Sequence, residues 1–473
     1  MSASAKAETP SLEITSLVHG GAGLGRLPDG RAVFVPLSVP GDRVRYRIRK
    51  EYARYAKAEL EAVLSPSAHR VAPACMYFGA CGGCDWQMLP YPHQCEWKQR
   101  LLHQSLVHNL GEQAAAALDS FLPAASPAGY RCRAQLKCSN LQNYFKLGFY
   151  RPGTHRVVGV DSCLILHPQL NALLAPLQRL FHKTRYAAHV EQIDAAVDDS
   201  EHPQVHTRLV IHYTGIDVKD FVAWLKTQMG TWDVAVVVSV RPAQKAPKDS
   251  RGRGRGGAKR GAYRLSPPER QLICVQGDAE LKLDIGVAGL ALACAPGDFT
   301  QVNLAQNRKL VELVVNLATA GDGADIDDVI YDLYCGVGNF ALPLALRGGE
   351  VVGVEANSGA IAQARKNAEL ASISNVRFVC ADVANFLARA GTTGEKPTTV
   401  VLDPPRAGAK EVVAALPATG VKRIVYVSCD QQTLMRDLKS LTAAGYALHY
   451  IRGLDMFPHT HHCEVVALLE LGC

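Results

Sequence analysis

The sequence lacks any run of 18 consecutive apolar residues, so we expect no segment that crosses a membrane. Its first residues, MSASAKAETPS, also lack the apolar stretch of a secretory signal. Charged residues make up only 20% of the chain and hydrophobic residues 48%, which is typical of a soluble globular protein. These features predict a cytoplasmic protein, and 473 residues are enough for two or three domains.

Cysteine, in contrast, is plentiful, with 14 residues. In a cytoplasmic protein cysteines stay reduced, so a cluster of them indicates a metal site or catalysis. Four cysteines form a candidate ligand set, a C-x5-C-x2-C array and one more distant member: Cys75, Cys81, Cys84 and Cys163. Four thiolates suit either structural zinc or a [4Fe–4S] cluster, and ligand chemistry alone slightly favours zinc. Cys95 and Cys132 are further thiols that could compete for this role.

Positive charge is concentrated in two segments. The formal net charge is +7, and residues 245–264 alone carry eight basic residues against Asp249. Residues 43–57 carry seven basic residues against Glu51. Both segments suit a polyanion such as RNA. The segment 243–262, which includes RGRGRGG, cannot bury a core, so we expect a disordered basic insert that is either a tolerated insertion or a tether for RNA.

Residues 9–67 are expected to form a small β domain. The stretch GGAGLGRLPDGRAVFVP predicts two short strands joined by a turn at 28–30. Residues 43–49 alternate strictly and place four arginines on one strand face, which is either a solvated edge or a nucleic-acid contact. The lack of interleaved acids favours contact. The glycine-rich opening and the later Pro-Gly-Asp at 40–42 resemble the TRAM domain, an OB-like RNA-binding barrel.

Residues 296–473 are expected to form an α/β domain, because apolar strands alternate with helical stretches from about 327 onward. The segment VIYDLYCGVGNF is a strand that enters a glycine-rich turn, where Gly336 and Gly338 would let a ligand approach the backbone. The next strand ends in Glu355, which could accept hydrogen bonds from ribose hydroxyls. This much also fits a dinucleotide enzyme.

Two later strand ends favour a class I methyltransferase over a dinucleotide enzyme. Asp382 follows one strand and could bind an adenine amine, and Asp403 follows another. The motif around Asp403, DPPR, also bears on which kind of atom the enzyme would methylate. Enzymes that methylate exocyclic amines typically have an aromatic residue where Arg406 stands, and RNA cytosine-5 methyltransferases place a cysteine beside these prolines. Neither pattern is present.

Cys429 follows the strand RIVYVS, at the end where ligands bind in open α/β sheets. Carbon 5 of uracil is a poor nucleophile, but a thiolate that adds to carbon 6 creates an enolate able to attack a methylsulfonium. A base must then remove the carbon 5 proton, and Glu464 is the candidate. The ordinary alternatives are a buried structural cysteine and a solvated acid at a strand end. We do not expect one metal site in FPHTHHCE, since adjacent strand residues such as His462 and Cys463 point to opposite faces.

The motifs DLYCGVGNF, LDPPRAG, VSCD and FPHTHHCE, in this order, resemble the RNA uracil-5-methyltransferase family over nearly the whole chain. The segment GDFTQVN resembles a further motif of the family. The resemblance implies an S-adenosyl-L-methionine-dependent enzyme of class EC 2.1.1, with Cys429 as nucleophile, Glu464 as general base and Phe299 stacked on the target base. It also implies methyl-donor contacts from six residues: Gln301, Tyr334, Asn339, Glu355, Asp382 and Asp403.

The resemblance also bears on the cysteines and on the substrate. The resemblance implies that the four cysteines hold a [4Fe–4S] cluster. Family members directed at tRNA lack both this cluster and the TRAM domain. The presence of both features therefore implies that the target is a uridine of 23S rRNA, which would become 5-methyluridine. The cysteine spacing differs from the C-x3-C-x2-C of radical methyl-donor enzymes. The alternatives are methylation of tRNA or of another rRNA site, and a non-catalytic RNA-binding assembly factor.

The expected architecture therefore has three parts and no obligate protein partner. A TRAM domain at 9–67 is followed by a central α+β domain at 68–295, which carries the iron–sulfur loop. The class I, Rossmann-like methyltransferase domain covers 296–473. Family architecture also implies that residues 96–125 could pack against this catalytic domain.

Overall fold

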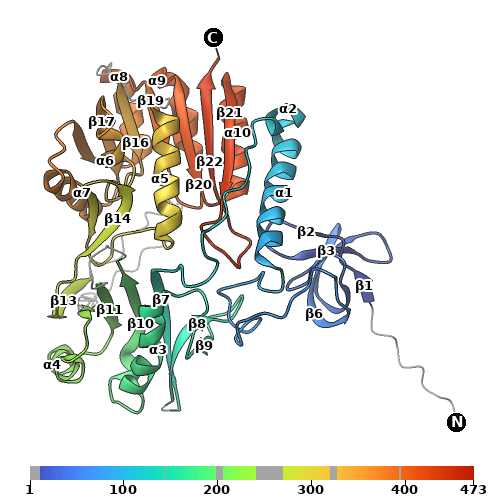
Figure 1. The fold of residues 1–473 in the computed structure, drawn as a ribbon, viewed down its shortest axis with the longest axis vertical. Coiled ribbons are helices and arrows are strands. Elements are labelled where there is room, and N and C mark those ends of the chain that lie inside the picture. The colour runs from blue at the N-terminus through green and yellow to red at the C-terminus, as the bar shows by residue number, and fades with distance from the viewer. Residues whose placement is uncertain are drawn as a thin grey trace, which may run out of the picture.

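The computed structural model describes residues 11–142, 144–198, 206–240, 270–319, 328–393 and 396–472. Within these residues the strands form sheets of six, seven, two and seven strands (Figure 1). The basic insert expected at 243–262 lies outside the described residues. No described helix is both long and apolar enough to cross a bilayer.

The first sheet forms a small barrel-like unit with strand order β1-β5-β6-β4-β3-β2. Its strands are β1 (Ser11–Glu13), β2 (Ser16–Leu17), β3 (Gly23–Arg26), β4 (Ala32–Val35), β5 (Arg43–Glu51) and β6 (Tyr55–Ser65). The predicted turn between β3 and β4 and the predicted strand of arginines are both confirmed. No acid is interleaved with the arginines in the sequence, but β6 pairs with β5 and brings Glu59 and Glu61 beside Arg47.

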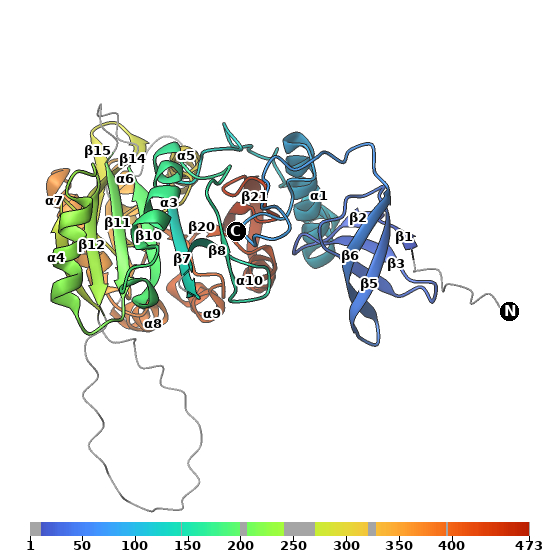
Figure 2. The same cartoon turned by 90° about the horizontal axis from the view of Figure 1, so that it is seen from below.

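Helix α1 (Tyr91–Leu110) stands between this unit and the C-terminal sheet (Figures 1 and 2). It packs against α10 (Gln431–Ala443) and β21 (Tyr446–Leu454). The buried ammonium of Lys98 lies 2.7 Å from a carboxylate oxygen of Asp455. The helix has a proline in its first turn, a position that is compatible with helical backbone. A short helix, α2 (Glu112–Ala115), follows.

The central sheet has the order β13-β12-β11-β10-β7-β8-β9. Its strands are β7 (Arg133–Leu141), β8 (Tyr144–Tyr150), β9 (Val157–Gly159), β10 (Val190–Val197), β11 (Thr207–Tyr213), β12 (Ala235–Val240) and β13 (Gln271–Gln276). Helices α3 (Pro168–Phe181) and α4 (Val218–Met229) pack on this sheet, and Ile193, Leu209 and Val236 share one core with their apolar side chains. The hairpin β14 (Leu281–Val287) and β15 (Leu290–Cys294) leads to the C-terminal sheet.

The C-terminal sheet has the order β18-β17-β16-β19-β20-β22-β21, and its first five strands are parallel, as predicted. The strands are β16 (Val329–Leu333), β17 (Glu350–Glu355), β18 (Val376–Cys380), β19 (Thr399–Leu402), β20 (Arg423–Ser428), β21 and β22 (Glu464–Leu471). The surrounding helices, besides α10, are α5 (Leu304–Ala318), α6 (Ala341–Ala345), α7 (Ser358–Leu370), α8 (Val383–Thr393) and α9 (Lys410–Thr419). The strand order reverses between β16 and β19, which is where open α/β sheets bind ligands.

Candidate active site

Five of the predicted site residues meet at one edge of the C-terminal sheet. Glu355 ends β17, Tyr334 follows β16, Asp403 follows β19 and Cys429 follows β20. Because these strands are parallel, their carboxyl ends lie side by side. Glu464 opens β22, which runs antiparallel to β20 and therefore begins at the same edge. The sheet thus brings one thiol, three carboxyl groups and a phenol together.

The glycine-rich turn after β16 has the tight geometry that its sequence predicts. Gly336 and Gly338 have φ angles of 54° and 99°, in the left-handed region that favours glycine. Tyr334 also has a positive φ, 67°, which is costly for a residue with a side chain. Its backbone N–H donates to the carbonyl of Val354 over 2.8 Å, which holds the turn against β17. Strain of this kind is typical of ligand-binding loops.

Two of the expected methyl-donor contacts are held by local hydrogen bonds. The side-chain amide of Asn339 pairs twice with that of Asn307 on α5, at 2.9 and 3.1 Å. One oxygen of Glu355 accepts from the backbone N–H of Asn357 over 2.8 Å. Both side chains are therefore fixed in place before any ligand binds.

The remaining expected contacts are more open. Asp382 is exposed, and one of its oxygens accepts from the backbone N–H of Asn385 over 3.0 Å. Gln301 is half-buried, on the loop that leads into α5. Phe299, on the same loop, is 70% exposed although it is a large apolar side chain. An exposed aromatic ring is well suited to stack on a base.

The charges at the sheet edge are strongly coupled. Burial, followed by the carboxylates of Glu464 and Asp403, raises the pKa of the Cys429 thiol to about 11, and Arg406 acts in the opposite direction. Burial raises the pKa of Asp403 to about 7. Burial and the charge of Asp403 raise the pKa of Glu464 well above its usual range. Glu464 is only 2% exposed, so the alternative of a solvated acid at a strand end does not hold.

The sequence reading missed Asp332, which lies within β16 and is fully buried. Burial raises its pKa well above the usual range, the backbone N–H of Ala341 lowers it, and the charges of Asp403 and Glu355 raise it further. A single acid inside an otherwise apolar strand was the signal that could have found it, because a buried carboxyl group is costly unless it serves a site.

The loop that precedes Glu464 is held by residues far away in the sequence. The carbonyl of His459 accepts from the backbone N–H groups of Asp85 and Trp86, at 3.1 and 3.0 Å. The backbone N–H of His459 donates to the side chain of Gln94 over 2.9 Å. Residues 85–86, which follow the cysteines at 75–84, and helix α1 therefore hold in place the loop that leads to the candidate base.

Further hydrogen bonds connect residues 85–86 both to this loop and to the N-terminal unit. His461 pairs with the carboxylate of Asp85, and its backbone N–H donates to the other oxygen over 2.9 Å. The indole of Trp86 donates to the carbonyl of Gly21 over 3.0 Å. His462 and Cys463 do not lie on the strand that we had expected, because β22 begins only at Glu464.

The four cysteines of the predicted ligand set line one cavity of about 110 Å³. Burial raises the pKa values of Cys81, Cys84 and Cys163, and that of Cys84 reaches about 12. Cys95 and Cys132 lie elsewhere, beside Asp455 and Val302. Among the residues that the structure describes, no set of three or more His, Cys, Asp or Glu side chains is arranged to hold a metal ion.

Comparisons with known proteins cover the whole chain. A family model described as tRNA (Uracil-5-)-methyltransferase matches residues 270–471, and the TRAM domain model matches residues 8–60. The 23S rRNA (uracil(1939)-C(5))-methyltransferase RlmD of Aeromonas hydrophila is 34% identical, over 97% of this chain and 95% of that protein. The corresponding protein of Thiobacillus denitrificans is 35% identical, over 98% of this chain and 99% of that protein.

A solved structure resembles nearly the whole chain. It is the crystal structure of the Pyrococcus abyssi tRNA (uracil-54, C5)-methyltransferase in complex with S-adenosyl-L-homocysteine. The TM-score is 0.70 and the sequence identity 24%, and the match covers 97% of this chain and 100% of that chain. At this identity the likeness shows that the fold is shared.

Proposed function

The chain belongs to the RNA uracil-5-methyltransferase family, and from this premise we propose that it methylates carbon 5 of a uridine in 23S rRNA, with S-adenosyl-L-methionine as methyl donor. The observation that carries this proposal is the identity of 34 to 35% to 23S rRNA enzymes over nearly the full length of both chains. The match includes the TRAM domain, whose barrel type binds nucleic acid.

The sheet edge fits the methyl donor. S-adenosyl-L-methionine, when bound, supplies an electrophilic methyl group on a positively charged sulfonium. Glu355 and Asp382, at the ends of β17 and β18, would hold the ribose and the adenine. Tyr334, Gln301 and Asn339 would line the rest of the site. The raised pKa of Asp403 indicates a carboxyl group that a nearby cation would return to its charged form.

Cys429 is proposed to act as the nucleophile. Its thiolate adds to carbon 6 of the uracil, and the electrons of the carbon 5–carbon 6 double bond move to form an enolate. Carbon 5 of this enolate would then attack the methyl group, while the methyl–sulfur bond of the donor breaks and its electrons stay on the sulfur. The resting thiol has a pKa of about 11, so it must lose its proton as the substrate binds, and the positive charge of Arg406 favours that loss.

Glu464 is proposed to act as the general base. It removes the proton from carbon 5, the double bond re-forms between carbon 5 and carbon 6, and the bond between carbon 6 and the sulfur breaks. Glu464 and Asp403 raise each other's cost of ionisation in a buried site, so together they hold fewer than two negative charges near neutral pH. A base with a raised pKa is also a better proton acceptor at that pH.

The cysteine cavity is proposed to hold a [4Fe–4S] cluster through Cys75, Cys81, Cys84 and Cys163. Support for this proposal comes from the position of the four thiols, which line one cavity of about 110 Å³, and from the family resemblance. The cluster would have a structural role, since its cavity adjoins residues 85–86, which form hydrogen bonds with His459.

Incubation of the enzyme with labelled methyl donor and separate rRNA and tRNA transcripts tests the proposed substrate. Nucleoside mass spectrometry should find 5-methyluridine only in the 23S rRNA. A product found only in tRNA would favour the second candidate function, which the family model that matches residues 270–471 suggests by its description. A chain that methylates neither RNA would favour the non-catalytic assembly factor.

Metal analysis of protein purified without oxygen tests the cluster. We expect a brown protein with about four irons per chain. Cys84→Ser should lose the iron and weaken folding or RNA affinity while the protein still binds the methyl donor. Cys380→Ser is a matched control, because this thiol is exposed and lies on β18. Stoichiometric zinc without iron would contradict the assignment.

A further inference from the structure

The central sheet has one apolar and one polar face. Ile193, Leu209 and Val236 belong to the core beneath α3 and α4. Side chains alternate along a strand, so the residues between them point to the opposite face. Lys137, Gln192 and His212 occupy that face on the neighbouring strands β7, β10 and β11, and the register places Gln192 directly across from both of the others. This row is polar and remains partly exposed.

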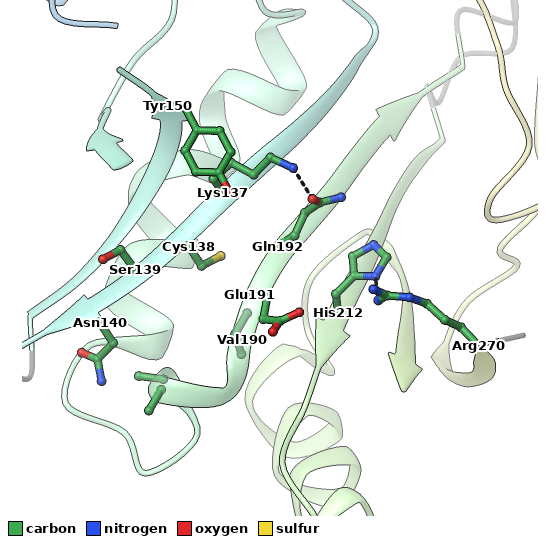
Figure 3. Close-up of a pocket in the computed structure, with 12 residues that line it drawn as sticks. Lys137, Cys138, Ser139, Asn140, Tyr150, Val190, Glu191, Gln192, His212 and Arg270 are labelled. Atoms are coloured by element: carbon green, nitrogen blue, oxygen red, sulfur yellow. Dashed lines mark hydrogen bonds between the residues drawn. The ribbon is translucent and has the colours of Figure 1, made fainter. Parts of the chain in front are cut away.

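The row lies in a cavity of about 540 Å³ that is open to solvent (Figure 3). Lys137 donates a hydrogen bond to Gln192, and its ammonium lies 5.5 Å from the centre of the Tyr150 ring. Arg270 donates to one ring nitrogen of His212, and the other ring nitrogen donates to Asp194 over 2.8 Å. Amide and phenol groups of this kind can form hydrogen bonds with the edge of a base, and the imidazole ring offers a flat face against which a base can stack.

A groove of about 400 Å³ adjoins this cavity and extends to the loop that carries Phe299. Lys137 and Tyr150 line both spaces. Beyond them, the groove is lined by Arg131 and Arg133 and reaches the exposed ring of Phe299. Its lining therefore combines three cations with aromatic rings and includes no carboxylate. Cations beside aromatic rings are the pattern that binds single-stranded nucleic acid, through phosphate contacts and stacking.

We propose that the polar face of the central sheet binds an unpaired stretch of the substrate RNA next to the target uridine. The backbone of this stretch passes Arg131, Arg133 and Lys137, and one base enters the cavity between Tyr150 and His212. This inference rests on the proposed function, because the target uridine fixes the RNA at Phe299. It goes beyond that function by assigning a binding site to a surface that performs no chemistry.

Two substrates and three variants test this inference. The substrates are a 23S rRNA fragment that the wild-type enzyme methylates and the same fragment trimmed of the unpaired nucleotides that flank the target. Tyr150→Ala removes a ring that is 37% exposed, and Lys137→Met removes one phosphate contact. Lys226→Met is the matched control, because this lysine is exposed on α4, which packs against the sheet from its apolar side.

We expect Tyr150→Ala to weaken binding of the long RNA about tenfold, as the loss of one stacked base does, and to leave binding of the trimmed RNA unchanged. Lys137→Met should also lower the slope of affinity against salt by about one. The control variant should behave as wild type on both RNAs. Equal losses on the long and the trimmed RNA, or no loss at all, would overturn the inference. If the wild-type enzyme methylates no RNA, it is the proposed function that fails.

Discussion

Charged groups are paired on strand β5 of the TRAM unit but are buried beside one another at the edge of the C-terminal sheet that carries Cys429 and Glu464, here called the catalytic edge. On β5, the exposed side chains of Arg47 and Arg49 form ion pairs with Glu59 on the neighbouring strand. At the catalytic edge, Glu464 lies beside a second acid, Asp403, and both are removed from water. Compensated charge is inexpensive, whereas uncompensated buried charge shifts pKa values.

The comparison indicates which of these charged groups lower the stability of the folded protein. The ion pairs of β5 and β6 keep a solvated strand in register and add little, because exposed pairs are screened. The acids at the catalytic edge oppose folding near neutral pH, and the proposed base and donor site would account for their presence there. Four predictions test the contrast, beginning with the largest effect.

Cys429→Ala should lower methylation by at least about 10⁴-fold, because no thiolate remains to open the uracil ring. Binding of the methyl donor, measured by calorimetry, should persist, since in the proposed reaction this residue contacts the RNA base rather than the donor. Cys463→Ala is a useful control, because that buried thiol accepts a hydrogen bond from Gln431 and has no role in the proposed reaction. Similar losses in both variants would mean that the defect is structural.

Lys98→Met should destabilise the protein by about 3–5 kcal/mol, because it leaves the buried carboxylate of Asp455 without its partner. Denaturant unfolding measures this loss. The double variant Lys98→Met with Asp455→Leu should recover much of the stability, since it leaves no buried charge. A loss in Lys98→Met no larger than that of an exposed ion pair would show that burial does not set the cost.

Asp403→Asn should raise the melting temperature at pH 8 and leave it nearly unchanged at pH 4. The native pKa of Asp403 is about 7, so the folded protein binds more protons than the unfolded chain between the ordinary value of 3.8 and that pH. The free energy of unfolding therefore falls as the pH rises through this window, and the amide removes that term. A rise at pH 8 of about 2–4 °C is expected, together with loss of donor binding. Equal melting temperatures at pH 8 would contradict the shifted pKa.

Glu59→Gln should have the smallest effect. The glutamate is partly exposed and its partners Arg47 and Arg49 are exposed, so the unfolding midpoint should not change measurably. RNA binding should tighten slightly at low salt, because two arginines lose a competing carboxylate. Weaker RNA binding in this variant would show that the strand does not contact RNA through its arginines.

The sequence predicted the parallel sheet because apolar strands alternate with helices, and parallel strands must place their carboxyl ends together. Residues at those ends, such as Cys429 and Asp403, could be grouped for that reason alone. The partners of a residue on a neighbouring strand could not be predicted, because nothing within 43–49 indicates that Glu59 pairs with that strand. The grip of Gln94 on His459 joins positions 365 residues apart, so no local pattern could reveal it.

The most direct test of the proposed chemistry is the Glu464→Gln variant, incubated with labelled methyl donor and substrate RNA. Without a base, the carbon 5 proton cannot leave and the thiolate cannot be expelled, so the reaction should stall after methyl transfer. We expect a protein–RNA species that survives denaturing electrophoresis and carries the label, and RNA with 5-fluorouridine should trap the wild-type enzyme in the same way. Turnover by Glu464→Gln near the wild-type rate, or an adduct that still forms in Cys429→Ala, would contradict the account.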